Sequence, residues 1–535
     1  MDITYVVLLI LAIIYVPIWF WVWRNPEKAA KVHLVKYGPL VMIKTHLGIK
    51  TMDKLAKYRR FWRVFGFVSK LLAAVLFFIM MYMLVMSILA LPSRIGTGGI
   101  GIQYALAIPG FNPMLPLTYG ILALFIAMVV HEMAHGIQSR ANDCKVDSTG
   151  LLYGVVPWGA FCEPNEEQLV KLPRRPQMDI YSAGISINTF VAAISIVAIL
   201  MLCSTIVPAD YGQGEGEEDL PGVYYIDDGS PAFLSGIPTS ALITGIKEAN
   251  ATDYSPVWAE SYTKTVSLGS DVEISPLRTY NLRYVTSDGS VNYSDPMQIG
   301  ALIKTVSNNS PASKAGLEPM TYLYSFSIDG KETLITGSCD FLEYMSATSP
   351  GDLITITTAT VADGGEIETV VHEGVYLTSS GAQGYLGISV TNSGFTMTTP
   401  SMMMETATDP FRGCTDPFSY VKALLSYLSG PINGLDPIPD SITWWYNAPA
   451  GDLTWVAIKS AYWIFWLDLL LAISNALPAY PFDGGFLFEG GINWLLERLG
   501  IKDDERRKKL SGSISGSIST VTLMMFFLVI LALII

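Results

Sequence analysis

The sequence predicts a polytopic α-helical membrane protein with about six transmembrane helices and an inserted β-rich extracytoplasmic region. Only 15% of the 535 residues are charged, whereas soluble chains average about 25%, and the mean hydropathy is +0.38. Apolar runs close to the length that crosses a bilayer, about 20 residues, recur along the chain. Between residues 210 and 395 they give way to Gly, Ser, Thr, Asp and alternating β-branched residues. This combination excludes a soluble enzyme.

The charge and the cysteine count exclude further classes of protein. The net charge of −13 would repel a nucleic-acid backbone, and 11% aromatic residues argue against intrinsic disorder. Five cysteines are too few for a disulfide scaffold, and none stands in a C-x-x-C zinc pattern. Cys339 and Cys414 lie in the expected extracytoplasmic region and are able to pair there, but we favour free thiols because no spacing demands a bridge.

Six segments have the length and hydropathy of transmembrane helices. Their bounds are 3–23, 71–92, 117–137, 180–206, 461–477 and 517–535. The first is too long for the apolar core of a signal peptide and starts with Met1-Asp2 rather than a basic residue, so we interpret it as an anchor. The chain is therefore expected to be a multi-pass protein of the cell membrane.

The distribution of charge predicts the orientation of these helices. Residues 24–70 contain twelve Lys and Arg against two acidic residues, which places this loop in the cytoplasm by the positive-inside rule. Alternation then places 140–175 and 498–509 inside as well. From 206 to 412 only 8 Lys and Arg stand against 26 acidic residues, as expected of a region outside the cytoplasm.

An internal repeat divides the inserted region into two units. Ser-Pro-Ala at 230–232, followed by Gly-Ile at 236–237, recurs 80 residues later as Ser-Pro-Ala at 310–312, followed by Gly-Leu at 316–317. The second unit continues with a Pro-Gly-Asp turn at 350–352. These phrases resemble PDZ domains, and the resemblance implies a peptide ligand bound by β-augmentation. Two β-rich spacers that bind nothing are the alternative.

We divide the chain into five parts. They are two N-terminal helices with a basic cytoplasmic loop (1–92), the first part of a membrane core (109–206), a first PDZ-like domain (210–305), a second PDZ-like domain (306–395), and the second part of the core with the final helix (413–535). The sequence suggests no role for the first part.

The strongest motif is His131-Glu132-Met133-Ala134-His135, inside the third apolar segment. Residues i and i+4 share one face of a helix, so both imidazoles can bind one zinc ion while Glu132 lies beside them as general base. Ionisable groups inside a membrane are costly and usually functional, which favours this interpretation over a polar pair that caps the inner end of the helix.

A catalytic zinc ion has three protein ligands and a water molecule, so the two histidines leave one ligand to find. His33, His46 and His372 lie outside the apolar segments and are expected to be ordinary surface or interfacial residues. We favour Asp483 as the third ligand, with a turn aspartate before Gly484-Gly485 as the alternative.

Two observations favour Asp483. Pro478 and Pro481 must break a helix, and a bilayer tolerates freed backbone only beside protein or a water-filled cavity. His131 and Asn475 each lie fourteen residues from the outer start of their segments, which corresponds to about 21 Å. Because both segments run from outside to inside, we expect the two motifs to meet towards the cytoplasmic side of the membrane.

The chain resembles the site-2 protease family, zinc metalloproteases that cut inside the membrane. The family combines an H-E-x-x-H helix with an N-x-x-P-x-x-x-x-D-G segment. The matching residues are His131, Glu132, His135, Asn475, Pro478, Asp483 and Gly484. The similarity extends to 151–161 and 183–188, although Ile185 stands where the family usually has Pro. A PDZ insert between the fourth and fifth spans is also a family feature.

The resemblance implies an intramembrane zinc metalloendopeptidase that hydrolyses peptide bonds within or near transmembrane segments. Zn²⁺ would be held by His131, His135 and Asp483, and Glu132 would transfer the proton. The partners implied are transmembrane proteins or peptides as substrates, the surrounding lipid, and a peptide ligand of the PDZ-like domains. No nucleic acid is expected.

The resemblance also suggests how a substrate is held. Asn475 and Asn188 are polar groups in apolar segments that would bind substrate backbone or an oxyanion, although helix packing explains Asn188 nearly as well. The stretch 151–161 resembles a membrane-associated β segment of the family that would pair with an opened substrate. Asp468, in the middle of the fifth segment, is equally well explained by a water path or by helix packing.

Two other functions are compatible with the same residues. The first is a PDZ-bearing membrane scaffold whose metal site is not catalytic. The second is a water-facing zinc protease with Glu as third ligand, which is disfavoured because no Glu of the inner loops or spans stands in a matching helical motif.

Overall fold

Contacts divide the molecule into two compact units. The computed structural model describes residues 3–94, 103, 108–113, 115–155, 157–211, 219–328, 330–361, 366–428 and 438–534. The helical unit comprises Met1–Leu202, Asp416–Pro437 and Leu453–Ile535, and the β-rich unit comprises Cys203–Thr415 and Ile438–Asp452.

The helical unit contains the apolar helices and several short connecting ones. Its described helices are α1 (Ile3–Arg24), α2 (Pro26–Lys31), α3 (Ile49–Ala56), α4 (Arg59–Arg94), α6 (Leu117–Ala141), α7 (Glu166–Lys171), α8 (Arg174–Cys203), α13 (Pro417–Leu428), α14 (Asp452–Asn475), α15 (Asp483–Arg498) and α16 (Asp504–Ile534). Within the described ranges, α4, α6, α8, α14 and α16 are long and apolar enough to cross a membrane. The first of the six expected spans is α1, whose described apolar stretch, Leu9–Arg24, is shorter.

Several of these helices are longer than the segments expected from hydropathy. α4 begins at Arg59 rather than near residue 71, and α16 begins at Asp504 rather than near residue 517. Hydropathy detects only the part of a helix that is apolar, whereas backbone hydrogen bonding continues into polar flanks that are still good helix formers.

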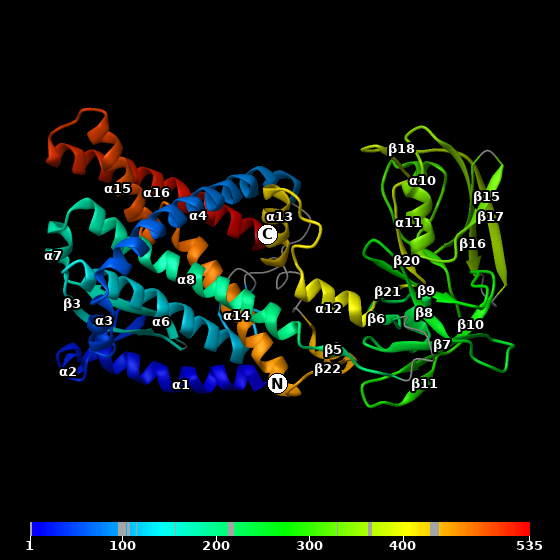
Figure 1. Cartoon of the computed structure of the whole chain (residues 1–535), viewed down its shortest axis with the longest axis horizontal. Helices are drawn as coiled ribbons and strands as arrows, with labels where there is room; N and C mark the ends of the chain where they lie inside the picture. The colour runs from blue at the N-terminus through cyan, green and yellow to red at the C-terminus, as the bar shows by residue number, and fades with distance from the viewer. Residues whose placement is uncertain are drawn as a thin grey trace. The chain divides into compact units, whose positions relative to one another are not determined.

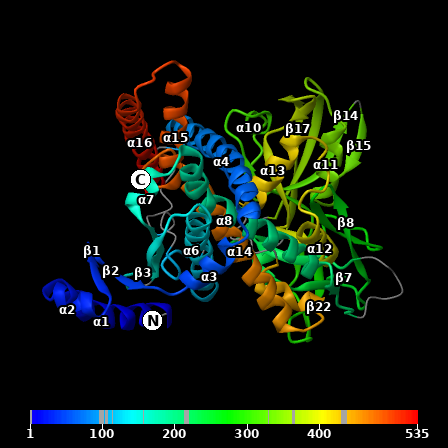
Figure 2. The ribbon, with the colours of Figure 1, turned by 60° about the vertical axis from the view of Figure 1, so that its left-hand side comes forward.

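Small side chains bring three of the long helices close together. Ala472 of α14 and Ala476, directly after this helix, pack in one buried cluster with Ile185 of α8 and with Ala73 and Leu76 of α4. Without a hydrophobic driving force between helices in lipid, such small residues allow the close van der Waals packing that holds them. α6, α8 and α14 lie side by side in both views (Figures 1 and 2).

A four-stranded antiparallel sheet lies next to α6 in the helical unit. Its strands are β1 (Leu34–Tyr37), β2 (Leu40–Thr45), β3 (Val146–Tyr153) and β4 (Pro157–Pro164), in the order β1-β2-β3-β4. The expected β segment, 151–161, covers the end of β3 and most of β4. The hairpin β1–β2 was not expected, and it joins the sheet by pairing Val41–Thr45 with Thr149–Tyr153.

The N-terminal region also packs on the α6 helix through α3. Met52 of α3 and Trp62 and Phe65 of α4 share a buried core with Ala134 of α6 and Ala183 of α8. The basic loop expected from the sequence is therefore a folded part of the helical unit.

In the described residues, the β-rich unit contains one large sheet and two separate two-stranded sheets. Its strands are β5 (Val207–Pro208), β6 (Gly222–Ile226), β7 (Leu242–Glu248), β8 (Val257–Tyr262), β9 (Thr265–Ser270), β10 (Thr279–Val285), β11 (Val291–Tyr293), β12 (Met297–Gln298), β13 (Ala301–Val306), β14 (Tyr322–Ile328), β15 (Lys331–Leu334), β16 (Leu353–Val361), β17 (Ile367–Tyr376), β18 (Thr378–Ser380), β19 (Gln383–Tyr385), β20 (Ile388–Asn392), β21 (Phe395–Thr398) and β22 (Tyr446–Asn447). Its helices are α9 (Pro231–Leu234), α10 (Pro311–Lys314), α11 (Ser338–Ser346), α12 (Pro400–Thr408) and the 3₁₀ turn η2 (Asp440–Trp445).

The repeated Ser-Pro-Ala phrases begin equivalent short helices. Ser230 caps α9 and Ser310 caps α10, each accepting a hydrogen bond from the backbone three residues later at 3.1 Å. Each serine packs directly on a glycine, Gly394 for Ser230 and Gly387 for Ser310, where an added Cβ would lie 2.2 Å from the serine Cβ. The two repeats therefore use the same local construction.

The β-rich unit has two hydrophobic cores, and their limits differ from the expected domain boundaries. One core contains residues between Val223 and Ile299, together with Phe395 and Met397 of β21. The other lies between Ala301 and Leu386. The expected boundary at 305/306 falls within β13, and β21 pairs with β6 of the first core. The first core is thus closed by a strand that follows the second, a long-range pairing with no local sequence signal.

All five cysteines are free, Cys339 and Cys414 included. His372 lies on β17, where its ring nitrogens contact Ala315 O at 2.8 Å and Thr358 Oγ1 at 3.0 Å, so it is an ordinary structural histidine.

Candidate metal centre

Two histidines face one another in the C-terminal half of α6. His131 and His135 are both buried, and their Nε2 atoms lie 3.2 Å apart. Their spacing of four residues places them on the same face of the helix, as the sequence predicts. Nδ1 of His135 lies 2.7 Å from Ile180 O, an acceptor, so Nδ1 carries a proton and Nε2 presents its lone pair.

Asp483 reaches the same point from a distant part of the chain. α14 ends at Asn475 and α15 begins at Asp483, with Pro478 and Pro481 in the turn between them. An added Cβ at Gly484 would lie 2.4 Å from Leu477 O, so only glycine fits this turn. The helix break expected from the two prolines is therefore present, and it places Asp483 at the first turn of α15.

The carboxylate of Asp483 contacts both imidazoles. Oδ2 lies 3.3 Å from His131 Nε2 and 3.2 Å from His135 Nε2. It is buried, with no other partner among the described residues. His135 Nε2 and Asp483 Oδ2 are thus two acceptors facing each other, an arrangement that a cation would stabilise.

The three atoms have the spacing of a tetrahedral zinc site. Bonds of about 2.0–2.1 Å at tetrahedral angles place ligand atoms about 3.3–3.4 Å apart. The three observed separations are 3.2, 3.2 and 3.3 Å. Two histidines and one carboxylate are a ligand set that zinc accepts in catalytic sites, so the residues fit this metal. In the described part of the chain, no other group of His, Cys, Asp or Glu is arranged to hold a metal.

Glu132 follows the first histidine and is held by the neighbouring sheet. Its Oε2 accepts a hydrogen bond of 2.8 Å from the backbone N–H of Cys162 on β4. Burial raises the pKa of the Cys162 thiol to about 12, and the nearby Glu132 carboxylate acts in the same direction. This environment favours the neutral thiol. The hydrogen bond from Cys162 N engages only one carboxylate oxygen of Glu132, and the other is left to accept a proton.

Gly184 of α8 packs directly on the two histidines. An added Cβ would lie 2.4 Å from His135 Nε2 and 2.6 Å from His131 Nε2. The stretch that resembles the family includes Gly184, but only the structure shows why a residue without a side chain is needed at this position. Without a side chain, α8 can approach close enough to support both rings.

Substituting alanine for Gly184 is expected to weaken zinc binding about 10- to 100-fold, the usual effect of disturbing the support of a metal ligand. The methyl group would displace the imidazoles, since real Cβ contacts under 3.0 Å essentially do not occur. Zinc content after dialysis against a graded chelator measures the effect. Gly516→Ala on α16 is the matched control because a Cβ there meets nothing within 4 Å. Equal zinc retention by the two variants would contradict this prediction.

The two asparagines predicted from the sequence are placed differently. Asn188 is fully buried one turn after Gly184, and neither of its side-chain polar atoms has a partner within the described ranges. Asn475 ends α14, where its Nδ2 donates to Leu471 O at 3.0 Å. Asp468, seven residues before Asn475 on the same helix, is fully buried, and both of its oxygens lack described partners. Within the described ranges, no hydrogen bond joins these three residues to the histidines.

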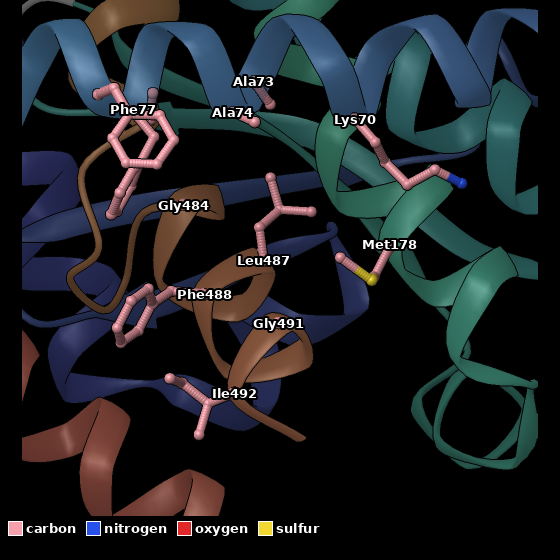
Figure 3. A pocket seen from close by; sticks show the side chains of 12 residues that line it. Lys70, Ala73, Ala74, Phe77, Met178, Gly484, Leu487, Phe488, Gly491 and Ile492 are labelled. Carbon is pink, nitrogen blue, oxygen red and sulfur yellow. The ribbon is translucent and has the colours of Figure 1, made fainter. Parts of the chain in front are cut away.

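An apolar cavity of about 330 Å³ approaches the turn that carries Asp483. Gly484 and Leu487 of α15 line it together with Phe77 of α4 and Met178 of α8 (Figure 3). Lys70 lies at its edge and forms an ion pair with Asp179. The sequence carries no signal for this cavity because its walls come from three separate helices.

Comparison with known proteins agrees with this geometry. Residues 119–530 match the model of peptidase family M50. An uncharacterized protein of Methanocaldococcus jannaschii is 34% identical over 164 residues, which are 30% of this chain and 42% of that protein. The similarity thus covers less than half the length of this relative.

Proposed function

Because the chain belongs to peptidase family M50, whose members are membrane-embedded metallopeptidases, we propose that it is an intramembrane zinc metalloendopeptidase. It would hydrolyse peptide bonds within or near the transmembrane segments of membrane proteins. The observation that carries the proposal is the convergence of His131, His135 and Asp483 to within 3.3 Å of one another. Both histidines lie on α6, a helix long and apolar enough to cross a membrane.

The residues of the site have separate roles in this proposal. His131, His135 and Asp483 would hold the zinc ion, which when bound polarises water and the scissile carbonyl. Glu132 would accept a proton from the attacking water and pass it to the leaving amine. The hydrogen bond from Cys162 N keeps the carboxylate in place beside the histidines. Asn188, whose amide is unpartnered in the described ranges, would bind substrate backbone or the oxyanion. Asn475 donates one N–H of Nδ2 to Leu471 O, so it would bind an oxyanion through the second N–H or accept from a substrate backbone N–H through its side-chain oxygen.

The edge of β4 offers a place for the substrate backbone. A transmembrane helix must open before hydrolysis because its amides are internally bonded. β4 is the last strand of its sheet in the described structure, and the N–H of Cys162 points away from β3 towards Glu132. The backbone N–H of Ala160 points to the same edge as that of Cys162, because the backbone groups of alternate residues in a strand point the same way. An opened substrate pairing here would pass beside the catalytic base.

The same proposal includes location and partners. The protein would be a multi-pass cell-membrane protein with its site towards the cytoplasm and the β-rich unit outside, because charge is distributed accordingly. The two repeats of the β-rich unit would act as PDZ-like domains that bind peptide. A scaffold with a non-catalytic metal is the alternative, but a structural zinc would use four protein ligands. The described residues bring three together and place Glu132 next to them.

Zinc removal tests the proposed function. The full-length protein, purified in detergent and placed in liposomes, is expected to contain one zinc ion per chain and to cleave a model single-span substrate. Dialysis against a chelator should abolish cleavage, and added Zn²⁺ should restore it, whereas Mg²⁺ should not because it prefers octahedral oxygen ligands. Undiminished cleavage by the zinc-free protein would exclude the metallopeptidase mechanism. Peptide binding without hydrolysis of any membrane substrate would favour the scaffold.

A further inference from the structure

A second apolar cavity, of about 260 Å³, lies directly against Glu132. Its walls come from α3 and the β2–α3 connection, from α6, and from the strands β2, β3 and β4. The lining residues are Ile43, Thr45, Leu47, Gly48, Met52, Phe125, Val129, Glu132, Met133, Thr149, Gly150, Leu151, Ala160 and Phe161. Glu132 is the only charged residue among them. The first five precede residue 119, where the family match begins.

The N-terminal part of this cavity is firmly attached to the rest. β2 pairs with β3 along five positions, so that Ile43 is opposite Leu151 and Thr45 is opposite Thr149. An ion pair of 2.7 Å links Lys44 to Glu163 on β4. These contacts fix β2 next to β3 and β4, the second of which is hydrogen-bonded to Glu132.

The helix α3 is attached to the histidine-bearing helix itself. An added Cβ at Gly136 would lie 2.5 Å from Met52 Sδ, so α3 packs as close to α6 as a glycine permits. Asp53 of α3 also forms an ion pair with Arg140 of α6. The position of α3, and with it this wall of the cavity, is therefore determined by its contacts with α6, the helix that carries Glu132 and the two histidines.

The interior of the cavity suits an apolar side chain. Its two hydroxyls are already hydrogen-bonded, since Thr149 Oγ1 donates to Leu47 O at 2.8 Å and Thr45 Oγ1 lies 3.3 Å from Thr149 Oγ1. The remaining lining, apart from Glu132, is aliphatic, aromatic or backbone. Leu47 is 83% exposed at one side, an apolar group that an incoming apolar segment would cover.

We propose that the segment β2–α3 forms the pocket that accepts an apolar substrate side chain flanking the scissile bond, and so sets the sequence preference of cleavage. This inference rests on the proposed function. Glu132 must lie within hydrogen-bond reach of the reacting water, so a group in a cavity that Glu132 lines is next to the cleaved bond. A substrate paired along the edge of β4 would direct alternate side chains to the sheet face that carries Ile43 and Leu151.

Changing the size of residue 43 tests the inference. After the cleaved bond has been mapped in a model single-span substrate, each residue flanking that bond is varied in turn to Ala, Leu and Phe. Ile43→Trp should lower kcat/KM for the Phe substrate relative to the Ala substrate by about tenfold or more at the position that enters the pocket, and Ile43→Ala should raise that ratio. Hydrophobic pockets discriminate by roughly 10- to 200-fold for changes of one methylene.

Met42→Trp is the matched control because Met42 is the neighbouring residue of β2 on its opposite face, paired with Leu152. It should leave the Phe-to-Ala ratio unchanged. The inference is overturned if Ile43→Ala retains zinc and cleaves the series with the wild-type ratio at both flanking positions, or if Met42→Trp shifts the ratio equally. Failure of the wild-type protein to cleave any substrate would instead reject the proposed function, so the two outcomes are distinct.

Discussion

Substituting glutamine for Glu132 is expected to lower kcat for peptide hydrolysis by at least about 10²- to 10⁴-fold, the usual contribution of a positioned general base. Zinc content should remain at the wild-type level. Glutamine has the same shape, and its carbonyl oxygen can still accept the hydrogen bond from Cys162 N. The variant therefore removes the proton acceptor while leaving the sheet, α6 and the three candidate ligands in place.

The measurement combines initial rates of substrate cleavage in liposomes with metal analysis of the same samples. Glu167→Gln is a suitable control because this carboxylate is exposed on the short helix α7, and its loss should change neither quantity. A Glu132→Gln protein that binds zinc and cleaves at the wild-type rate would rule out Glu132 as the base. Simultaneous loss of zinc would instead show that Glu132 acts on the metal site rather than on the proton.

The positions of the metal-site residues follow from periodicity and depth, both of which a sequence contains. A spacing of four residues determines that His131 and His135 share a face of α6. Two prolines predict that α14 cannot continue beyond Asn475. Equal distances of His131 and Asn475 from the expected starts of their apolar segments predict that the chain leading to Asp483 begins at the level of the histidines, although α14 itself begins at Asp452 rather than near residue 461. The residue spacing and the prolines each concern a single helix, and the depth comparison assumes only that both helices cross the same bilayer. None of the three requires knowledge of side-chain packing.

The remaining features depend on contacts between segments far apart in the chain. Residues 41–45 pair with residues 149–153, more than one hundred positions away, and hydropathy does not register such a pairing. Likewise, β21 closes the core of the first repeat after the second repeat has intervened. The need for glycine at 184 becomes visible only when the imidazole rings are seen against α8. The candidate metal-site residues follow from local patterns in the sequence, whereas the packing around them depends on contacts that such patterns do not show.

Substituting alanine for Asp483 is expected to remove zinc from the protein and to abolish hydrolysis. Two imidazoles from one helix would remain, and they make an incomplete site because catalytic zinc uses three protein ligands. The loss of affinity should exceed the about 10- to 100-fold that follows removal of an outer-shell partner. A readout independent of activity is thermal unfolding, since a ligand that binds only the folded state stabilises it by mass action. Added Zn²⁺ should raise Tm of the wild-type protein but not of this variant.

The control for Asp483→Ala is Glu497→Gln, which removes a carboxylate from the same helix. Glu497 lies at the far end of α15 in an exposed ion pair with Arg174, and such exposed pairs contribute little to stability. This control should keep full zinc content and the zinc-dependent rise in Tm. If Asp483→Ala kept both as well, the third ligand would have to be another residue, and the contacts of 3.2 and 3.3 Å would reflect packing of a turn aspartate against two histidines. Loss of zinc from Asp483→Ala alone would link the kinked segment between α14 and α15 to the metal directly.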